Sequence, residues 1–210
     1  QDLQQESADY NGDVEDLFQA ELYLISPITE AGRFLRKEYF LTSQQRDIER
    51  QILKGIRQKH TGYYWFIGLP GTGKTLLLYD LAMKLSGRQK VCLIHCGRAG
   101  KEWRILHERL RRIDYLSDEQ IHENMDLSEY NGVLIDEAHL LSEENLQMIL
   151  QACGQQPVIF SSDCEDMISP EELDQNTVKA MRHLPEMQTY HLTNRIRTNA
   201  ELSSFIQNMM

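Results

Sequence analysis

The sequence has few cysteines and no long apolar run, and these absences exclude two classes of protein. Four cysteines among 210 residues are too few for a disulfide scaffold of this length. No apolar run approaches the roughly 18 residues that would indicate a membrane span. An initiating methionine and a basic-then-apolar signal segment are also missing, so we expect a piece cut from a longer protein or a processed product.

A zinc site is not expected either, because no paired Cys-x-x-Cys occurs. Cys92, His95 and Cys96 lie close together, but they belong to an apolar run that is typical of a buried strand. On such a strand Cys92 and His95 would face opposite sides. We therefore expect reduced core thiols in a cytoplasmic protein rather than metal ligands.

Basic residues are missing from two long stretches of the chain. Residues 1–30 contain eight acids and residues 113–178 contain 16, with no Lys or Arg in either, whereas residues 31–112 contain 18 bases and six acids. The formal net charge of −10 argues against a protein that simply coats nucleic acid. However, residues 31–210 sum to only −2, so the total hides a polarised chain.

The composition, with 41% hydrophobic and 26% charged residues, is typical of a globular protein and excludes a wholly disordered chain. Short apolar strands alternate with amphipathic helices, which predicts an α/β fold: a parallel sheet with helices on both faces. We expect strands at 63–67, 91–95, 133–135, 158–160 and 189–192, and helices at 43–60, 74–85, 101–113, 143–152, 170–184 and 199–209.

A glycine-rich loop between the first strand and a helix fits the phosphate-binding pattern G-x-x-x-x-G-K-[ST] at every fixed position. Glycines let the backbone turn tightly enough to aim N–H groups at a triphosphate, and the following helix adds its positive end. Lys74 should reach the β- and γ-phosphates, and the Thr75 hydroxyl should bind Mg²⁺. The nucleotide-binding residues expected here are Gly68, Pro70, Gly71, Thr72, Gly73, Lys74 and Thr75.

Two carboxylates follow the apolar strand at 133–135, at the end where parallel sheets bind ligands. Asp136 can hold Mg²⁺ as the acidic partner of Thr75, and Glu137 can orient or deprotonate the attacking water. Together with the glycine-rich loop they predict nucleoside triphosphate hydrolysis. ATP is favoured over GTP because no guanine-reading Asn/Thr-Lys-x-Asp pattern occurs.

Three further groups of residues are candidates for sensing the bound nucleotide or coupling its hydrolysis to other parts of the protein. Gln45, near the start of the first helix, can read an adenine edge with one donor and one acceptor, or simply sit in a capped helix start. Residues 160–163 end a strand, where they could face the γ-phosphate or form an ordinary turn. Arg195 and Arg197, near the C-terminus, could stabilise transition-state charge or lie on the surface.

In this order, the motifs resemble those of superfamily 1 DNA/RNA helicases, and in particular the schlafen-related bacterial ATPases with domain of unknown function 2075. The resemblance covers about residues 40–210 and implies a RecA-like P-loop fold. It implies that Gln45 is the adenine-reading glutamine, that Asp136 and Glu137 form motif II, and that Arg197 is the arginine of motif IV. Residues 158–166 fall where motif III belongs.

The sequence departs from this family at two points. Asp166 stands where motif III usually carries a glutamine, which puts in doubt how the ATP state is coupled to nucleic acid. The chain also ends just after motif IV. The domain organisation expected is therefore an N-terminal arm and accessory segment at 1–41, a first motor lobe at 42–187, and the start of a second lobe at 188–210.

Two functions remain open at this point. The first is a Mg²⁺-dependent ATPase that serves as a helicase or translocase motor, in which the basic block at 98–112 and Trp103 contact single-stranded DNA or RNA. That block also fits a solvated helix face with Trp103 in the core. The second is an ATP-driven switch or assembly module whose acidic stretch at 113–178 docks a protein partner. Neither function involves a membrane, and the oligomeric state is unknown.

Overall fold

The computed structural model describes residues 25–59, 61–87, 89–97, 103–163 and 177–193 of the chain. All five expected strands form, and one more is present. The six strands are β1 (Tyr63–Gly68), β2 (Val91–His95), β3 (Ile113–Ser117), β4 (Val133–Asp136), β5 (Val158–Asp163) and β6 (Gln188–Leu192). The helices are α2 (Ala31–Leu35), α3 (Ser43–Lys59), α4 (Lys74–Leu85), α5 (Trp103–Arg109), α6 (Glu143–Cys153) and α8 (Thr177–Arg182), with short 3-10 turns η2 (Asp118–Gln120) and η3 (Ala138–Leu140).

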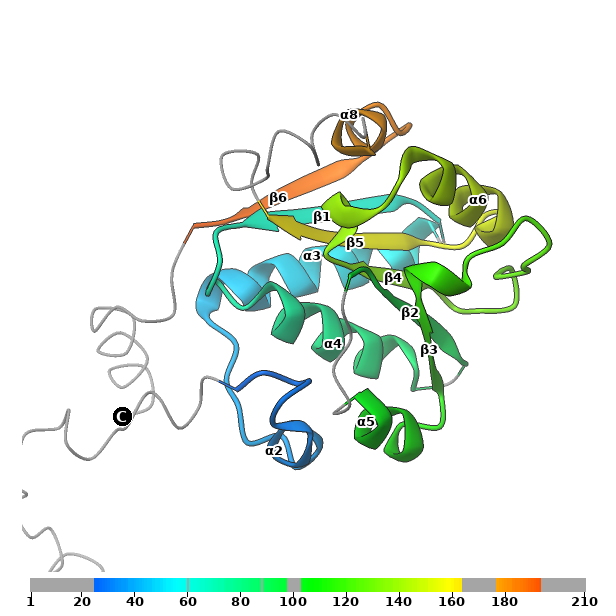
Figure 1. Cartoon of the computed structure of the whole chain (residues 1–210). Helices are drawn as coiled ribbons and strands as arrows, with labels where there is room; N and C mark the ends of the chain where they lie inside the picture. The colour runs from blue at the N-terminus through cyan, green and yellow to red at the C-terminus, as the bar shows by residue number, and fades with distance from the viewer. Residues whose placement is uncertain (1–24, 60, 88, 98–102, 164–176, 194–210) are drawn as a thin grey trace, which may run out of the picture.

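All six strands belong to one sheet in the order β3-β2-β4-β5-β1-β6, and every neighbouring pair is parallel (Figure 1). Each crossover therefore passes through a helix or a loop on one face of the sheet. This arrangement confirms the expected α/β, RecA-like fold. It also brings the carboxyl ends of β1, β4 and β5 to one edge, where ligands bind in such sheets.

Alternate residues of the strands bury against two separate layers. In β1, Tyr64 and Phe66 pack into the core shared with α2, α3, α4 and α5, whereas Trp65 and Ile67 pack into the core shared with α6 and α8. Figure 1 shows the first group of helices on one side of the sheet and the second group on the other. Because both faces are covered, the central strands are apolar throughout, which is why the sequence displays them so clearly.

The additional strand, β3, corrects the expected helix at 101–113. The helix α5 ends at Arg109, and Ile113 already belongs to β3. The strand lies at the edge of the sheet and alternates buried Ile113 and Tyr115 with the more exposed Asp114, whose carboxylate bonds Lys90 and Tyr130. Such an alternation is a weaker strand signal than an apolar run, so the sequence alone does not separate β3 from the end of the preceding helix.

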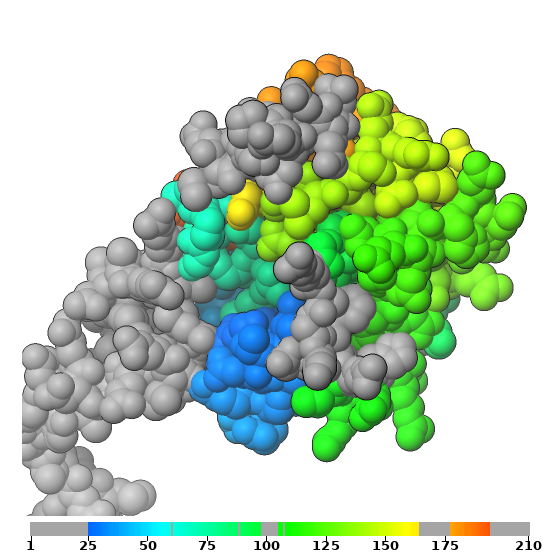
Figure 2. All heavy atoms as spheres, in the orientation of Figure 1, coloured from blue at the N-terminus to red at the C-terminus, as the bar shows by residue number. Residues whose placement is uncertain are grey.

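Residues beyond the expected boundaries at 41/42 and 187/188 contact the same core and the same sheet as the segment between them. Ile25, Ala31 and Phe34 are buried in the same core as α3 and α4, so part of the expected accessory segment belongs to the fold. The helix α2 lies against α5, as Figures 1 and 2 show in blue and green. At the other end, β6 pairs with β1 in the same sheet rather than standing apart.

Several expectations lie outside the described residues. They concern the arm at 1–12, the helix at 199–209, the segment 164–176 with Asp166, Arg98 and Lys101 of the basic block, Arg195 and Arg197; the side chain of Trp103 is likewise not described. Within the described part of the chain, no helix is long and apolar enough to cross a membrane.

Candidate active site

The glycine-rich loop connects β1 to α4, as the motif requires. Gly71 and Gly73 have φ angles of 81° and 77°, in the left-handed region that glycine adopts without strain. Gly73 is the N-cap of α4, so the unpaired N–H groups and positive end of that helix face the loop. The Thr72 hydroxyl donates a 2.8 Å hydrogen bond to the Leu69 carbonyl across the turn. The loop therefore has the backbone shape of an anion-binding site.

Lys74 points across the loop rather than out to solvent. Its ammonium group lies 2.6 Å from the Asp163 carboxylate at the end of β5 and donates to the carbonyls of Gly68 and Leu69 at 3.2 and 3.3 Å. The Lys74 side chain is only 7% exposed. A buried charge needs such partners, because an unpaired ammonium in the interior is strongly disfavoured.

Asp136 lies at the end of β4 and is completely buried. One carboxylate oxygen accepts hydrogen bonds from the Ser161 hydroxyl at 2.6 Å and the Thr75 hydroxyl at 3.4 Å. The other oxygen has no hydrogen-bond partner among the described residues and lies 3.6 Å from Nδ1 of His95. Burial opposes a charged imidazole, yet the Asp136 carboxylate raises the pKa of His95 above its usual value. The structure thus brings Thr75 and Asp136 together, as the spacing predicts.

Glu137 follows Asp136 in the sequence, and it also lies near the phosphate loop. Its φ of 54° is unusual for a residue with a side chain and marks a sharp change of direction between β4 and η3. Burial, reinforced by the charges of Asp136 and Asp163, raises the pKa of Glu137 to about 7, against the opposing charge of Lys74. Glu137 can therefore exchange a proton near neutral pH.

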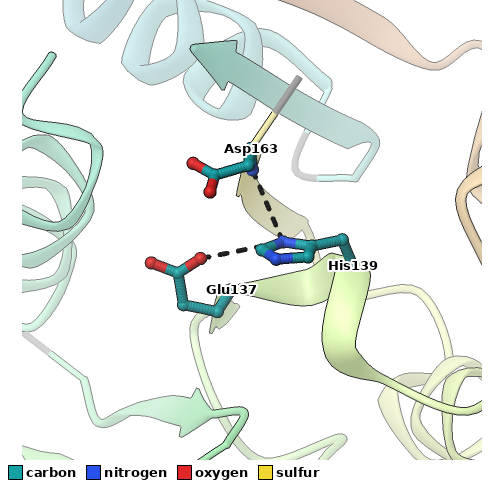
Figure 3. A group of neighbouring side chains, drawn as sticks. All are labelled: Glu137, His139 and Asp163. Carbon is teal, nitrogen blue, oxygen red and sulfur yellow. Dashed lines mark hydrogen bonds and ion pairs between the residues drawn. The ribbon is translucent and has the colours of Figure 1, made fainter. Parts of the chain in front are cut away.

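Figure 3 shows how Glu137, His139 and Asp163 face one another from η3 and the strand ends. Nδ1 of His139 lies 3.7 Å from the Glu137 carboxylate and accepts a 3.4 Å hydrogen bond from the Asp163 backbone N–H. Donor atoms of the three side chains lie within 4.8 Å of one another, a spacing that would allow a metal ion. Because Asp163 is already paired with Lys74, the arrangement is better described as a link between the ends of β4 and β5.

Glu137 and Asp163 line a cleft of about 330 Å³. The other lining residues come from the phosphate loop and the start of α4 (Pro70, Gly71, Gly73, Lys74, Thr75 and Leu76) and from the segment before α2 (Ile25, Ser26 and Pro27). The last three residues were not among the expected site residues. No sequence motif indicates them, since their place depends on how the segment before α2 packs.

The two adjacent glutamines at the start of α3 face different parts of the site. Gln45 is completely buried; its amide nitrogen donates to the carbonyls of Thr72 at 2.9 Å and Gly73 at 3.4 Å. Its amide oxygen accepts from the Thr42 N–H, and the Gln45 N–H is capped by the Thr42 hydroxyl. This is a capping box, so the expected helix start is present.

Gln44 instead joins α3 to the end of β6. Its amide nitrogen donates to the His191 carbonyl at 2.9 Å and to the Thr193 hydroxyl at 3.2 Å, while its amide oxygen accepts from the Thr193 N–H at 3.1 Å. The first turn of α3 therefore contacts both the phosphate loop and the strand that leads toward the C-terminus.

The remaining polar residues of β5 divide between the two faces of the sheet. Ser161 faces Asp136, whereas the Ser162 hydroxyl accepts a 2.8 Å hydrogen bond from the Trp65 indole on the opposite face. Of the expected group at 160–163, only Ser161 and Asp163 lie on the side of the loop. Cys92 is completely buried, and burial, with smaller contributions from the nearby Cys153 and Asp114, raises the pKa of its thiol.

Residues 64–210 match the family described as Schlafen group 3, DNA/RNA helicase domain. The matched region is well over half of the chain and includes the phosphate loop, Asp136 and Glu137. It confirms the expected resemblance to schlafen-related helicases, whereas the narrower assignment to domain of unknown function 2075 stays a prediction. A search of the curated proteins found no match.

Three solved structures are similar to this chain at low identity. The helicase domain of Hef from Pyrococcus furiosus is 15% identical (TM-score 0.46; 79% of this chain and 40% of that one). The large terminase of the thermophilic bacteriophage D6E is 12% identical (TM-score 0.48; 81% of this chain and 50% of that one). The Pif1 helicase of Candida albicans is 14% identical (TM-score 0.45; 80% of this chain and 42% of that one). This chain spans half or less of the length of each.

Proposed function

Since this chain belongs to the Schlafen group 3 family of DNA/RNA helicase domains, we propose that it binds and hydrolyses ATP with Mg²⁺ as a motor lobe of a helicase or translocase. One observation carries the proposal: the hydroxyl of Thr75, which lines the same cleft as Lys74 and Glu137, lies 3.4 Å from the buried carboxylate of Asp136 at the end of β4. The residues expected to bind phosphate, metal and water are therefore gathered at one edge of the sheet.

The donor set at this edge fits Mg²⁺. The ion prefers oxygen ligands, and the Thr75 hydroxyl and Asp136 carboxylate supply them. One buried oxygen of Asp136 has no hydrogen bond to any described residue, so it is an acceptor that a cation or its bound water would satisfy. Bound Mg²⁺ would neutralise charge on the β- and γ-phosphates.

The protein groups then have distinct tasks in hydrolysis. Lys74 neutralises phosphate charge after leaving Asp163, and the N–H groups of the loop hold the phosphate oxygens. Glu137 orients the attacking water in line with the γ-phosphate and accepts its proton; its raised pKa suits a base at neutral pH. Arg197, which lies outside the described residues, is proposed to stabilise transition-state charge from motif IV.

The partner proposed is single-stranded DNA or RNA, which a helicase motor engages through a basic surface. The alternative, an ATP-driven switch acting on a protein partner, is favoured by the acidic stretch at 113–178. We place either activity in the cytoplasm, in keeping with the free thiols of Cys92, Cys96 and Cys153.

Steady-state ATPase measurements with and without single-stranded DNA and RNA test the proposal. We expect Mg²⁺-dependent hydrolysis that rises on addition of a single strand, with the stimulation weakening at high salt. The Lys74→Ala variant should be inactive and serves as the background control. ATP hydrolysis that no polynucleotide stimulates would favour the switch, and failure of the chain to bind ATP would refute the proposal.

A further inference from the structure

We propose that Gln45 is a positioning residue of the phosphate loop: it holds the loop's backbone from behind so that an N–H group faces the phosphates, whatever base the nucleotide carries. The inference rests on the proposed function and differs from the expected role of Gln45 as an adenine reader. It is carried by the hydrogen bonds that the Gln45 amide makes in the structure.

The Gln45 amide nitrogen is engaged by the phosphate loop. It lies within hydrogen-bond distance of two loop carbonyls, those of Thr72 at 2.9 Å and Gly73 at 3.4 Å. The amide orientation is chemically defined, because its oxygen accepts from the Thr42 N–H while its nitrogen faces carbonyl oxygens. The side chain is also completely buried. Contact with an adenine edge would therefore require Gln45 to abandon the loop.

The consequence for the loop follows from peptide geometry. A trans peptide holds its C=O and its N–H on opposite sides of one plane. By fixing the Thr72 carbonyl on the α3 side, Gln45 turns the N–H of Gly73 to the other side, and Gly73 lines the cleft. The Thr72–Gly73 peptide is thus oriented by a side chain that never touches the ligand.

The second contact contributes less. The Gly73 carbonyl also accepts a 3.0 Å hydrogen bond from the Leu77 N–H within α4, so the helix itself helps to orient the N–H of Lys74. The N-cap of α4 is a glycine, so it has no side chain of its own that could cap the helix or hold the preceding peptide. Gln45 therefore stabilises the peptide that α4 cannot hold, the one between Thr72 and Gly73, and its effect is concentrated on the Gly73 N–H.

Binding of three ligands separates this role from adenine reading. Dissociation constants for ATP, GTP and inorganic tripolyphosphate, each with Mg²⁺, are measured by calorimetry for the wild-type chain and for Gln45→Met. Methionine fills the same buried space but cannot donate. We expect all three ligands to bind about tenfold more weakly, by a common factor, because a lost orienting hydrogen bond acts on the phosphates they share. The exposed Gln51→Met on the same helix is the matched control and should leave all three unchanged.

Other binding results would contradict the positioning role of Gln45, and each would point to a different explanation. Loss of ATP binding with unchanged tripolyphosphate binding would assign Gln45 to the base. Unchanged binding of all three ligands would show that the loop holds its shape without Gln45. If Gln45→Met does not fold, Gln45→Leu gives the same comparison, since an uncharged aliphatic side chain also cannot donate. Failure of the wild-type chain to bind any ligand would instead refute the proposed function itself.

Discussion

The ammonium group of Lys74 lies 2.6 Å from the carboxylate of Asp163. The contact follows from the register of the sheet, which pairs Gly68 at the end of β1 with Asp163 at the end of β5. The lysine of the phosphate loop is therefore held by a carboxylate of the protein's own sheet. A phosphate group that recruits Lys74 must compete with that carboxylate, and its negative charge also opposes a triphosphate in the cleft.

Replacing Asp163 with asparagine should make ATP bind more tightly. The change keeps the shape of the side chain but removes the competing charge, and we expect the dissociation constant to fall by about three- to tenfold. Calorimetric titration of ATP with Mg²⁺ measures it. The exposed Asp126→Asn, which removes the same charge from the surface, should have no effect. Weaker binding by Asp163→Asn would mean that Asp163 contributes to the ligand site.

Replacing Glu137 with glutamine should separate binding from turnover. Glutamine can still contact a water molecule but cannot accept its proton, so we expect the ATPase rate to fall by about a hundredfold or more. ATP affinity should change little, because glutamine keeps the size and shape of the glutamate side chain. Turnover and calorimetric binding measured on the same preparation check this, and a wild-type rate would remove Glu137 from the mechanism.

Gly68 should not tolerate even a methyl group. A Cβ at this position would lie 2.6 Å from the Thr72 hydroxyl and 2.9 Å from the Leu192 Cβ, where β1 meets β6. We expect Gly68→Ala to lower the free energy of unfolding by about 2 kcal/mol, since both strands are fixed by their pairing. Urea denaturation measures the loss. Gly87→Ala, where the nearest atom lies 3.5 Å away, should behave like the wild type.

Removing the Gln44 side chain should loosen the end of β6. Its amide oxygen accepts the Thr193 N–H, and its nitrogen bonds the His191 carbonyl. We expect faster amide hydrogen exchange at Thr193 in Gln44→Ala, with a loss of about 1 kcal/mol in local stability. The strand pairing of β6 with β1 further back should keep its protection. Unchanged exchange at Thr193 would show that β6 is held by its neighbours alone.

The pH dependence of stability should change when Glu49 becomes glutamine. Burial, together with a hydrogen bond to Asp80, raises the pKa of Glu49 from 4.5 to about 7, against the nearby Lys84. Protonation is therefore favoured in the folded state, so the wild type loses stability as the pH rises through this window. We expect Glu49→Gln to lose about 2 kcal/mol less than the wild type between pH 5 and pH 8.

Asp80 does not disturb that comparison. Its carboxylate is buried on α4 and accepts a hydrogen bond from the Tyr39 hydroxyl; it also pairs with Lys84 at 3.0 Å. Although burial opposes its ionisation, these partners and Glu49 lower the pKa of Asp80, so its titration falls below the window in which Glu49 acts. Urea denaturation at both pH values measures the difference, and parallel losses in the two proteins would contradict the assignment.

Four of the five strands that the sequence predicts are buried on both faces. Val91–His95 and Val158–Asp163 stand out as apolar runs because α-helices cover both sides of the sheet. The edge strand Ile113–Ser117 carries a half-exposed acid between two buried residues and gives only a short alternation. Such a pattern cannot be told from the last turn of a basic helix by periodicity alone.

The candidate site also contains features that local sequence patterns predict and contacts that they do not. The Gly68–Thr75 loop and the Asp136–Glu137 pair are short local patterns, because phosphate and metal binding demand particular residues at fixed spacing. The Lys74–Asp163 ion pair joins residues 89 positions apart, and the contact of Gln45 with Thr72 spans 27. Contacts of this kind depend on the order and register of the strands, which no local pattern encodes.

The packing of α3 has a consequence for how this domain is delimited. The family match begins at residue 64, at the second residue of β1. A protein fragment cut there would lose Ile48, Ile52 and Ile56, which fill the core against α4, and would leave that face of α4 open to water. The unit defined by sequence similarity is thus smaller than the unit that folds, and an expression boundary chosen from similarity alone would remove part of the core.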